Sequence, residues 1–230
     1  MKVIPHPKFE GVFLVERAGR KRRLATQNLV PGFRSYDDEV VMEFRGREYR
    51  VWPTSRSKPS AAIQRGLRNF PIRRGVRILY LGIASGTTAS HFSDIVGREG
   101  IIYGVEVAHR VLIDLLPVAR ARKNIVPILA NARRPEEYSG LVEEVDVVYA
   151  DVAQPDQDEI LLENCEMYLK RGGVAMIAVK ASSIDVTLPP KKVYTAVERK
   201  MVEGGLRVLE RVDLSPTYPK HAMIVAKKVS

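Results

Sequence analysis

The 230-residue sequence lacks several features that would each have indicated a different class of protein. Its single cysteine, Cys165, excludes an internal disulfide and a cysteine-based zinc cluster. No apolar run approaches the roughly 20 residues that a membrane-spanning helix needs, and the first residues lack the apolar core of a secretory signal. We therefore expect a cytoplasmic protein that binds no metal.

Positive charge is present in excess, but only in the first third of the chain. Residues 1–80 contain 18 Lys and Arg against 7 Asp and Glu, a net charge of +11, whereas residues 81–230 contain 19 against 20, a net charge of −1. A basic region beside a nearly neutral one favours the docking of a polyanion such as nucleic acid on one face. Charge alone leaves open the alternative that this region is only a well-solvated surface.

The pattern of apolar residues divides the chain into two predicted domains, 1–55 and 56–230. The first domain holds short apolar stretches separated by Gly and Pro, which indicates a small antiparallel sheet: Phe9–Val15, Val40–Phe44 and Tyr49–Trp52. In the second domain, short β-branched stretches alternate with helical ones, which predicts a seven-stranded, mostly parallel α/β sheet with helices on both faces. Its predicted strands are Arg77–Gly82, Ile101–Glu106, Ile125–Ala130, Val145–Ala150, Val174–Lys180, Leu206–Asp213 and Ala222–Lys228, the last two forming an antiparallel pair at one edge. Its predicted helices include Thr88–Val96, Arg110–Arg120, Gln157–Leu169 and a helix near Lys191–Glu203.

A loop of small residues follows the first predicted strand of this sheet, in the segment Leu79–Thr88. Small residues let a backbone approach a ligand closely, and open α/β sheets bind ligands at the carboxyl ends of their strands. Glu106 ends the second strand about 20 residues later, where a carboxylate can accept both hydroxyls of a ribose. The loop lacks the second glycine of a pyrophosphate-binding G-x-G-x-x-G motif, so it suits a nucleoside ligand without pyrophosphate. A plain strand–helix turn is the alternative.

Two further polar residues follow buried strands at the same edge of the sheet. Asp151 comes after Val145–Ala150, and Lys180 ends the next strand. Because a buried lysine is rare unless it is paired, we expect Asp151 to be the partner of Lys180. The alternative is a lysine that reaches solvent. Asp156 is expected to be a helix N-cap.

Several strings of the sequence resemble fibrillarin, the methyltransferase of box C/D ribonucleoproteins. They are YLGIASGTTASHFSDIVG, VDVVYADVAQPDQ, MIAVKASSIDVT, HAMIV, the segment Ser55–Lys58 before Ala61–Ile63, and Arg122–Ile128. The resemblance covers nearly the whole chain in order. It implies a Rossmann-like sheet of the class I S-adenosylmethionine-dependent (SAM-dependent) methyltransferases. The short form without a Gly/Arg-rich tail is similar to the archaeal members.

The resemblance also implies a set of site residues. The catalytic positions are Lys58, Asp151, Lys180 and His221. The other histidines, His6, His91 and His109, match no catalytic position and are interpreted as surface residues. The cofactor positions are Gly82, Ala84, Ser85, Gly86, Thr87, Thr88, Glu106, Val107, Asn131, Ala132, Asp151, Val152, Ala153 and Gln154.

One of these cofactor positions departs from the family pattern. Asn131 stands where family members usually have Asp, whose carboxylate would accept a hydrogen bond from the adenine amino group. The Asn131 side chain can still accept through its carbonyl oxygen, but without charge. We expect weaker or altered adenine binding and not its loss.

The implied activity is SAM-dependent methylation of ribose 2′-hydroxyls in rRNA and tRNA. A box C/D guide RNA would choose the site by base pairing, within a particle that also contains a Nop-type scaffold protein and a kink-turn-binding protein of ribosomal type. Alternatives are methylation of protein side chains such as glutamine or of a small molecule, methylation of RNA bases, or a non-catalytic RNA-binding subunit. A base methyltransferase needs a pocket for a splayed base, often lined by aromatics, and only 7% of this chain is aromatic.

Overall fold

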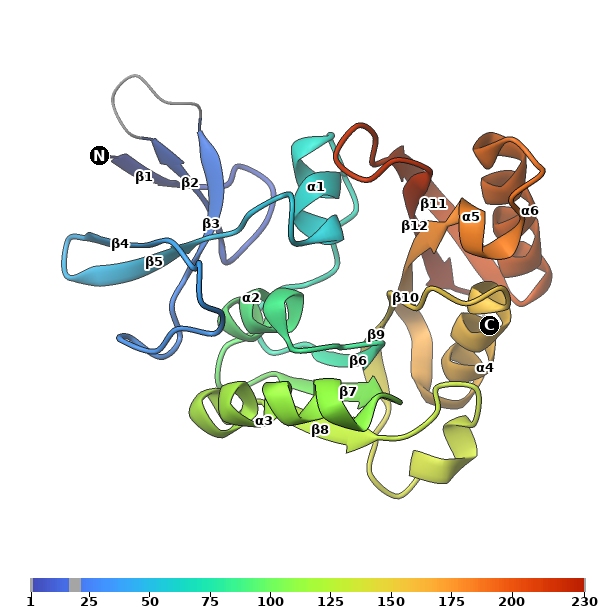
Figure 1. The fold of residues 1–230 in the computed structure, drawn as a ribbon, viewed down its shortest axis with the longest axis horizontal. Helices are drawn as coiled ribbons and strands as arrows, with labels where there is room; N and C mark the ends of the chain where they lie inside the picture. The colour runs from blue at the N-terminus through green and yellow to red at the C-terminus, as the bar shows by residue number, and fades with distance from the viewer. Residues whose placement is uncertain (1, 17–21, 230) are drawn as a thin grey trace.

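The computed structural model describes residues 2–16 and 22–229, which form two sheets joined in the chain by the helix-containing segment 52–76 (Figure 1). The first sheet contains β1 (Lys2–Pro5), β2 (Val12–Glu16), β3 (Arg23–Gln27), β4 (Val41–Phe44) and β5 (Arg47–Val51). The second contains β6 (Arg77–Leu81), β7 (Ile101–Glu106), β8 (Ile125–Leu129), β9 (Val145–Ala150), β10 (Leu169–Lys180), β11 (Leu206–Asp213) and β12 (His221–Lys228). The helices are α1 (Lys58–Gln64), α2 (Thr87–Val96), α3 (His109–Arg122), α4 (Gln157–Tyr168), α5 (Ala181–Ile184) and α6 (Pro190–Glu203), with a 3₁₀ turn at Pro135–Tyr138.

The seven-stranded sheet has the order β11-β12-β10-β9-β6-β7-β8. Its five strands from β10 to β8 are mutually parallel, whereas β12 and β11 run antiparallel at one edge. The predicted mostly parallel sheet and the predicted antiparallel edge pair are therefore confirmed. Since all parallel strands end at the same edge, the loops that follow them meet there.

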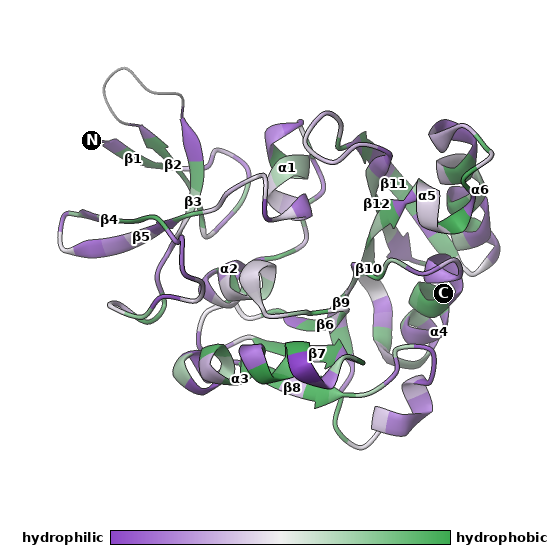
Figure 2. Cartoon of the chain, in the orientation of Figure 1, coloured by the Kyte–Doolittle hydropathy of each residue, from purple (hydrophilic) through white to green (hydrophobic). Residues whose placement is uncertain are grey.

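Helices cover both faces of this sheet, as strands that are apolar at successive positions require. Side chains point to opposite faces at successive strand positions. Ile78 and Tyr80 of β6 belong to the core cluster that contains residues of α1, α2 and α3, whereas Leu79 and Leu81 belong to the cluster that contains residues of α4 and α6. Figure 2 shows the central strands as hydrophobic, and α6 with hydrophobic and hydrophilic residues side by side.

The smaller sheet is antiparallel with the order β1-β2-β3-β5-β4, so the predicted small antiparallel sheet is confirmed. Two of its strands, β1 and β3, were not predicted. Both are short, and β1 ends in a proline while β3 begins with an arginine, so neither has the apolar run used for prediction. The predicted domain boundary at residues 55/56 falls in the connection between β5 and α1, and it remains a prediction.

One strand of the large sheet begins earlier than predicted. β10 starts at Leu169, directly after α4, instead of at Val174. The segment Lys170–Gly173 is polar and largely exposed, and the pairing with β9 shifts register across it. Because this first part of β10 is polar and exposed, it lacks the apolar residues from which the strand was predicted.

A buried network of charged groups joins the two sheets through α2 and α3. The two oxygens of Asp94 receive hydrogen bonds from Arg50 Nη1 at 2.7 Å and from Arg122 Nη1 at 2.6 Å. Arg50 is also paired with Glu39, and all four side chains are 0% exposed. Breaking one member of such a pair leaves an uncompensated buried charge. The network therefore fixes the smaller sheet against α2.

His91 belongs to the same interface, and its interpretation as a surface residue was wrong. The ring is fully buried, stacks on Trp52 at 5.4 Å between centroids, and contacts the hydroxyls of Thr26 at 2.8 Å and Tyr36 at 3.0 Å. Burial, with Arg50 and then Arg122 nearby, holds the pKa of His91 well below its ordinary value of 6.5. His109 is exposed and His6 is partly buried.

Candidate active site

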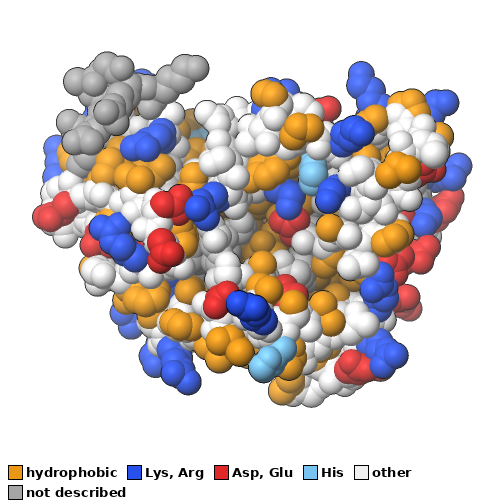
Figure 3. Space-filling view, in the orientation of Figure 1, with side chains coloured by type: hydrophobic (Ala, Val, Ile, Leu, Met, Phe, Trp, Pro, Cys, Tyr) orange, Lys and Arg blue, Asp and Glu red, His pale blue; other side chains and the backbone are white. Residues whose placement is uncertain are grey.

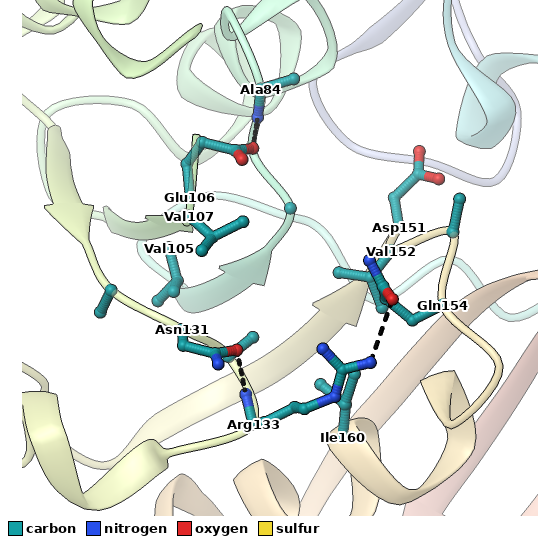
Figure 4. Close-up of a pocket in the computed structure, with 14 residues that line it drawn as sticks. Ala84, Val105, Glu106, Val107, Asn131, Arg133, Asp151, Val152, Gln154 and Ile160 are labelled. Atoms are coloured by element: carbon teal, nitrogen blue, oxygen red, sulfur yellow. Dashed lines mark hydrogen bonds between the residues drawn. The ribbon is translucent and has the colours of Figure 1, made fainter. Parts of the chain in front are cut away.

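A cavity of about 230 Å³ lies at the carboxyl ends of β6, β7, β8 and β9 (Figure 4). Ten of the residues predicted to bind a cofactor line it: Gly82, Ala84, Glu106, Val107, Asn131, Ala132, Asp151, Val152, Ala153 and Gln154. Four other lining residues were not predicted: Val105, Ala130, Arg133 and Ile160. The cavity thus forms where neighbouring parallel strands end, at the position that the sheet topology predicts for a ligand.

Gly82 allows the ends of β6 and β9 to approach each other beside this cavity. Its φ of +76° lies in the left-handed region, and a Cβ at this position would stand 2.8 Å from the carbonyl oxygen of Asp151. No other residue type fits this approach without a shift of the backbone. The glycine that the sequence marks as the start of the ligand loop is therefore required by the packing of the loop itself.

The Glu106 carboxylate is held in place by backbone groups on both sides. One oxygen accepts a hydrogen bond from the Ala84 N–H at 3.1 Å, and the other accepts one from the Ala108 N–H at 2.9 Å. Each carboxylate oxygen keeps a further lone pair for a ligand. Glu106 therefore ties the loop after β6 to the end of β7 and still has acceptor capacity for two hydroxyls.

The remaining predicted cofactor residues lie beside the cavity without lining it. They are Ser85, Gly86, Thr87 and Thr88, in the turn into α2 and in its first residues. The buried Thr88 hydroxyl donates a hydrogen bond to the Ser57 hydroxyl at 3.0 Å. Ser57 directly precedes Lys58, so this bond connects the ligand loop to the start of α1.

A charged cluster begins at the edge of the cavity. Lys58 donates to Asp151 Oδ1 at 2.5 Å, and the buried Tyr149 hydroxyl donates to Asp151 Oδ2 at 3.3 Å. The Lys58 and Asp151 side chains are 21% and 19% exposed. Figure 3 shows basic, acidic and histidine side chains close together beside a hollow in the middle of this face. Asp151 therefore belongs both to the cavity and to the charged cluster.

The expected pairing of Asp151 with Lys180 was wrong, because Lys58 takes that place. The register pairs Ile177 of β10 with Ala150 of β9, so β10 continues past Asp151 before Lys180 is reached. Two residues of strand correspond to roughly 7 Å. Within residues 2–16 and 22–229, no carboxylate lies within ion-pair distance of the Lys180 ammonium.

His221 lies beside Lys180, since β10 and β12 pair these two residues directly. His221 Nδ1 is 2.8 Å from the carbonyl oxygen of Pro219. Because a carbonyl only accepts, Nδ1 carries the hydrogen and Nε2 is the acceptor of the neutral ring. Burial lowers the pKa of His221 from 6.5, although the Pro219 bond acts in the opposite direction. The ring is thus neutral at pH 7.

Tyr218 is an aromatic residue of the cluster that the sequence analysis did not connect with it. The Lys58 ammonium lies 5.6 Å from the centre of its ring, and the His221 ring lies 5.9 Å away. Burial, with the nearby Asp151 charge, raises the pKa of Tyr218 to about 12. The closeness of Tyr218 to His221 in the chain is the sequence signal that connects the two residues.

Neither a metal cluster nor a membrane-crossing helix is found in the described part of the chain. No three His, Cys, Asp or Glu side chains there are grouped so as to hold a metal ion. No helix there is long and apolar enough to cross a membrane.

Asp156 occupies the N-cap position of α4 as expected, but its side chain makes no capping hydrogen bond.

Comparison with known proteins gives the family. A family model described as Fibrillarin matches residues 3–230. The chain belongs to the fibrillarin family. The sequence resemblance to fibrillarin is thereby confirmed over nearly the whole chain.

Relatives in the fibrillarin family are similar in sequence and in structure. A protein from Pyrococcus horikoshii named fibrillarin-like rRNA/tRNA 2′-O-methyltransferase is 54% identical over 96% of each chain. The crystal structure of Aeropyrum pernix fibrillarin with natively bound S-adenosyl-L-methionine is 51% identical, with a TM-score of 0.92 over 98% of each chain. A chain of a fibrillarin/Nop5p complex is 40% identical, with a TM-score of 0.84, and the match covers 96% of this chain and 98% of that one.

Proposed function

We propose that this chain is a SAM-dependent RNA methyltransferase that methylates ribose 2′-hydroxyls of rRNA and tRNA. One observation carries the proposal: Asp151 lines the cavity and also bonds to Lys58 in the charged cluster. A methyl donor in the cavity and an acceptor hydroxyl at the cluster would then meet at this residue. The named relatives support the same activity.

The residues of the cavity fit a nucleoside-bearing methyl donor. Glu106 presents a fixed carboxylate for the two ribose hydroxyls, since backbone N–H groups already hold both of its oxygens. Val107 is an apolar side chain that is 66% exposed at the cavity wall, where a flat adenine ring would cover it. Asn131 and Ala132 would hold the polar edge of the adenine.

Two tasks fall to the side chains of the cluster. When bound, SAM supplies the methyl group on a sulfonium, which is already strongly activated. Lys180 would contact the ribose 2′-oxygen and hold it in position for transfer. Asp151 fixes Lys58, and the Lys58 ammonium binds the ribose or the adjacent phosphate.

The proton of the 2′-hydroxyl needs an acceptor as the new bond forms. Nε2 of the neutral His221 is an acceptor within the cluster, and Lys180 is the group that contacts the 2′-oxygen from which the proton leaves. Because the pKa of His221 is lowered from 6.5, a rate that depends on this acceptor should fall only at a pH below 6.5. A Lys180→Ala enzyme with unchanged methyl transfer at saturating RNA would contradict the role of Lys180.

Site selection comes from partners. A box C/D guide RNA pairs with the target, a Nop-type scaffold recruits this chain as Nop5p binds fibrillarin in the solved complex, and a kink-turn-binding protein of ribosomal type completes the particle. The basic first third of the chain would contact the RNA backbone or the scaffold. The particle would work in the cytoplasm of an archaeal-type cell.

The experiment that tests the function is methyl transfer from tritiated SAM in a particle reconstituted from this chain, the scaffold, the kink-turn-binding protein, and matched guide and target RNA. We expect label on one ribose of the target, opposite the guide. Label on a base or on protein would favour the alternative acceptors. Site-specific labelling of bare RNA without partners would contradict guide-directed selection.

A further inference from the structure

Arg133 connects the two loops that flank the cavity. It follows β8, and its guanidinium contacts the Asp156 carboxylate at two points, with Nε–Oδ2 at 2.5 Å and Nη2–Oδ1 at 2.6 Å. Nη2 also donates to Gln154 Oε1 at 3.0 Å. Arg133 and Gln154 both line the cavity, and Figure 4 shows the hydrogen bond between them. Three hydrogen bonds thus join the connection after β8 to the connection between β9 and α4.

The Asp156 carboxylate contacts Arg133 instead of capping the start of α4. A carboxylate at a helix N-cap ordinarily accepts a hydrogen bond from the first turn of the helix, which stabilises the helix. The Asp156 side chain makes no such bond and turns to Arg133 instead. The hydrogen bond from Arg133 lowers the pKa of Asp156, so the carboxylate is charged across the physiological range.

Asn131 also favours the contact between Arg133 and Asp156. Asn131 Oδ1 accepts a hydrogen bond from the Arg133 backbone N–H at 3.1 Å (Figure 4), which holds the turn from which the Arg133 side chain departs. A carboxylate at position 131 would compete with Asp156 for the guanidinium. The neutral Asn131 therefore leaves Arg133 available to span the two loops.

We propose that Arg133, Gln154 and Asp156 form a clasp across the cofactor cavity that sets how long SAM stays bound. The inference rests on the proposed function, since it takes SAM as the ligand of the cavity. The clasp holds the β8 and β9 connections together over the ligand, so release requires both contacts of Arg133 with Asp156 to open. The bound ligand in turn keeps the two loops in the arrangement that the clasp needs. The three residues act on retention of the ligand and take no part in the transfer itself.

A second ion pair of the same geometry supplies a matched control. Arg74 contacts Glu99 at two points, with Nε–Oε2 at 2.6 Å and Nη2–Oε1 at 2.7 Å. These residues lie just before β6 and β7, at the opposite edge of the sheet from the cavity. A substitution of Arg74 removes a similar surface ion pair and leaves the connections after β8 and β9 unchanged.

The test is the dissociation rate of tritiated SAM from the isolated chain, measured by chase with unlabelled SAM. Asp156→Asn and Arg133→Gln should each speed release about fivefold, which corresponds to about 1 kcal/mol. The double variant should release SAM no faster than either single variant, because each substitution alone already breaks the contact between Arg133 and Asp156. Arg74→Gln should release SAM at the wild-type rate.

Three results would contradict the clasp. These are wild-type release rates in both Asp156→Asn and Arg133→Gln, effects that multiply in the double variant, and an Arg74→Gln effect as large as theirs. Failure of the wild-type chain to bind SAM would instead contradict the proposed function. Hydrogen exchange gives a readout independent of chemistry: SAM should protect residues 131–134 and 152–157 together in the wild type, and this joint protection should be lost in Asp156→Asn while the rest of the sheet stays protected.

Discussion

Two charged clusters lie near opposite ends of α2, and they differ in burial and in the number of hydrogen bonds that their central carboxylate accepts. Around Asp94, the carboxylate receives two arginines, the Thr26 hydroxyl and the Leu29 N–H, and the charged side chains are 0% exposed. Around Asp151, the carboxylate receives Lys58 and a tyrosine hydroxyl, and about a fifth of the Lys58 and Asp151 side chains is exposed.

The difference separates a structural cluster from a reactive one. A saturated and buried network has no free group for a ligand, and it stabilises the fold only as long as every member is present. A half-open cluster with an ammonium group that lacks a carboxylate partner within the described residues retains donors and acceptors for a substrate. Variants in the first cluster should therefore change stability, and variants in the second should change rate.

The largest expected effect is that of Asp94→Ala on the free energy of unfolding. Loss of this carboxylate leaves Arg50 and Arg122 buried without their shared partner, which should cost about 3–5 kcal/mol. Chemical denaturation measures it. Asp38→Ala removes an exposed ion pair with Arg56 and should cost less than about 1 kcal/mol. Equal stability of the two variants would remove the distinction between the clusters.

Lys180→Ala should show the reverse pattern. We expect the rate of methyl transfer at saturating RNA and SAM to fall on the order of 10²-fold or more, with the melting temperature nearly unchanged. Lys192→Ala, an exposed lysine on α6, should leave both quantities as in the wild type. If Lys180→Ala lost stability in proportion to rate, the cluster would be structural as well.

The buried His91 should make a large contribution to the pH dependence of stability. Its pKa is held well below 6.5 by burial, so the unfolded chain takes up a proton below pH 6.5 that the folded chain refuses. Stability should therefore fall as the pH drops from 6.5 to 5, by at most about 1.4 kcal/mol per pH unit, and should not depend on this group above pH 7. Thermal melts of the wild type and of His91→Gln check this, since the variant should lose that part of the slope. Identical slopes would show that another group titrates.

The smallest expected effect is that of Asn131→Asp on cofactor affinity. A charged acceptor for the adenine amino group should tighten SAM binding by about fivefold, or about 1 kcal/mol, if the clasp stays closed. Calorimetry measures the affinity, and the dissociation rate shows whether the new carboxylate draws Arg133 away from Asp156. Weaker binding together with faster release would mean that competition for Arg133 outweighs the gain.

The sequence predicted well those parts of the molecule that depend on local patterns. Short apolar, β-branched stretches located the strands of the large sheet, and the topology of parallel strands placed Glu106 and Asp151 at one edge. The family resemblance added Lys58 and His221, which no spacing rule connects with Asp151.

The errors concern long-range geometry. Which lysine reaches Asp151 depends on the register of β10 against β9 and on the position of α1, neither of which a local pattern contains. His91 was placed at the surface because the burial of a polar residue depends on partners such as Thr26 and Tyr36 that are far away in the chain. The Arg133 contacts were missed for the same reason, since their partners follow a different strand.

The most direct test of ribose methylation is a target RNA that lacks one oxygen. In the reconstituted particle, a target with a single 2′-deoxy nucleotide opposite the guide position should accept no methyl group, while the same RNA with ribose there should be methylated to completion. Both targets pair equally with the guide, so only the acceptor hydroxyl differs. Equal labelling of the two targets would contradict ribose 2′-O-methylation and would direct the search to a base or a protein acceptor.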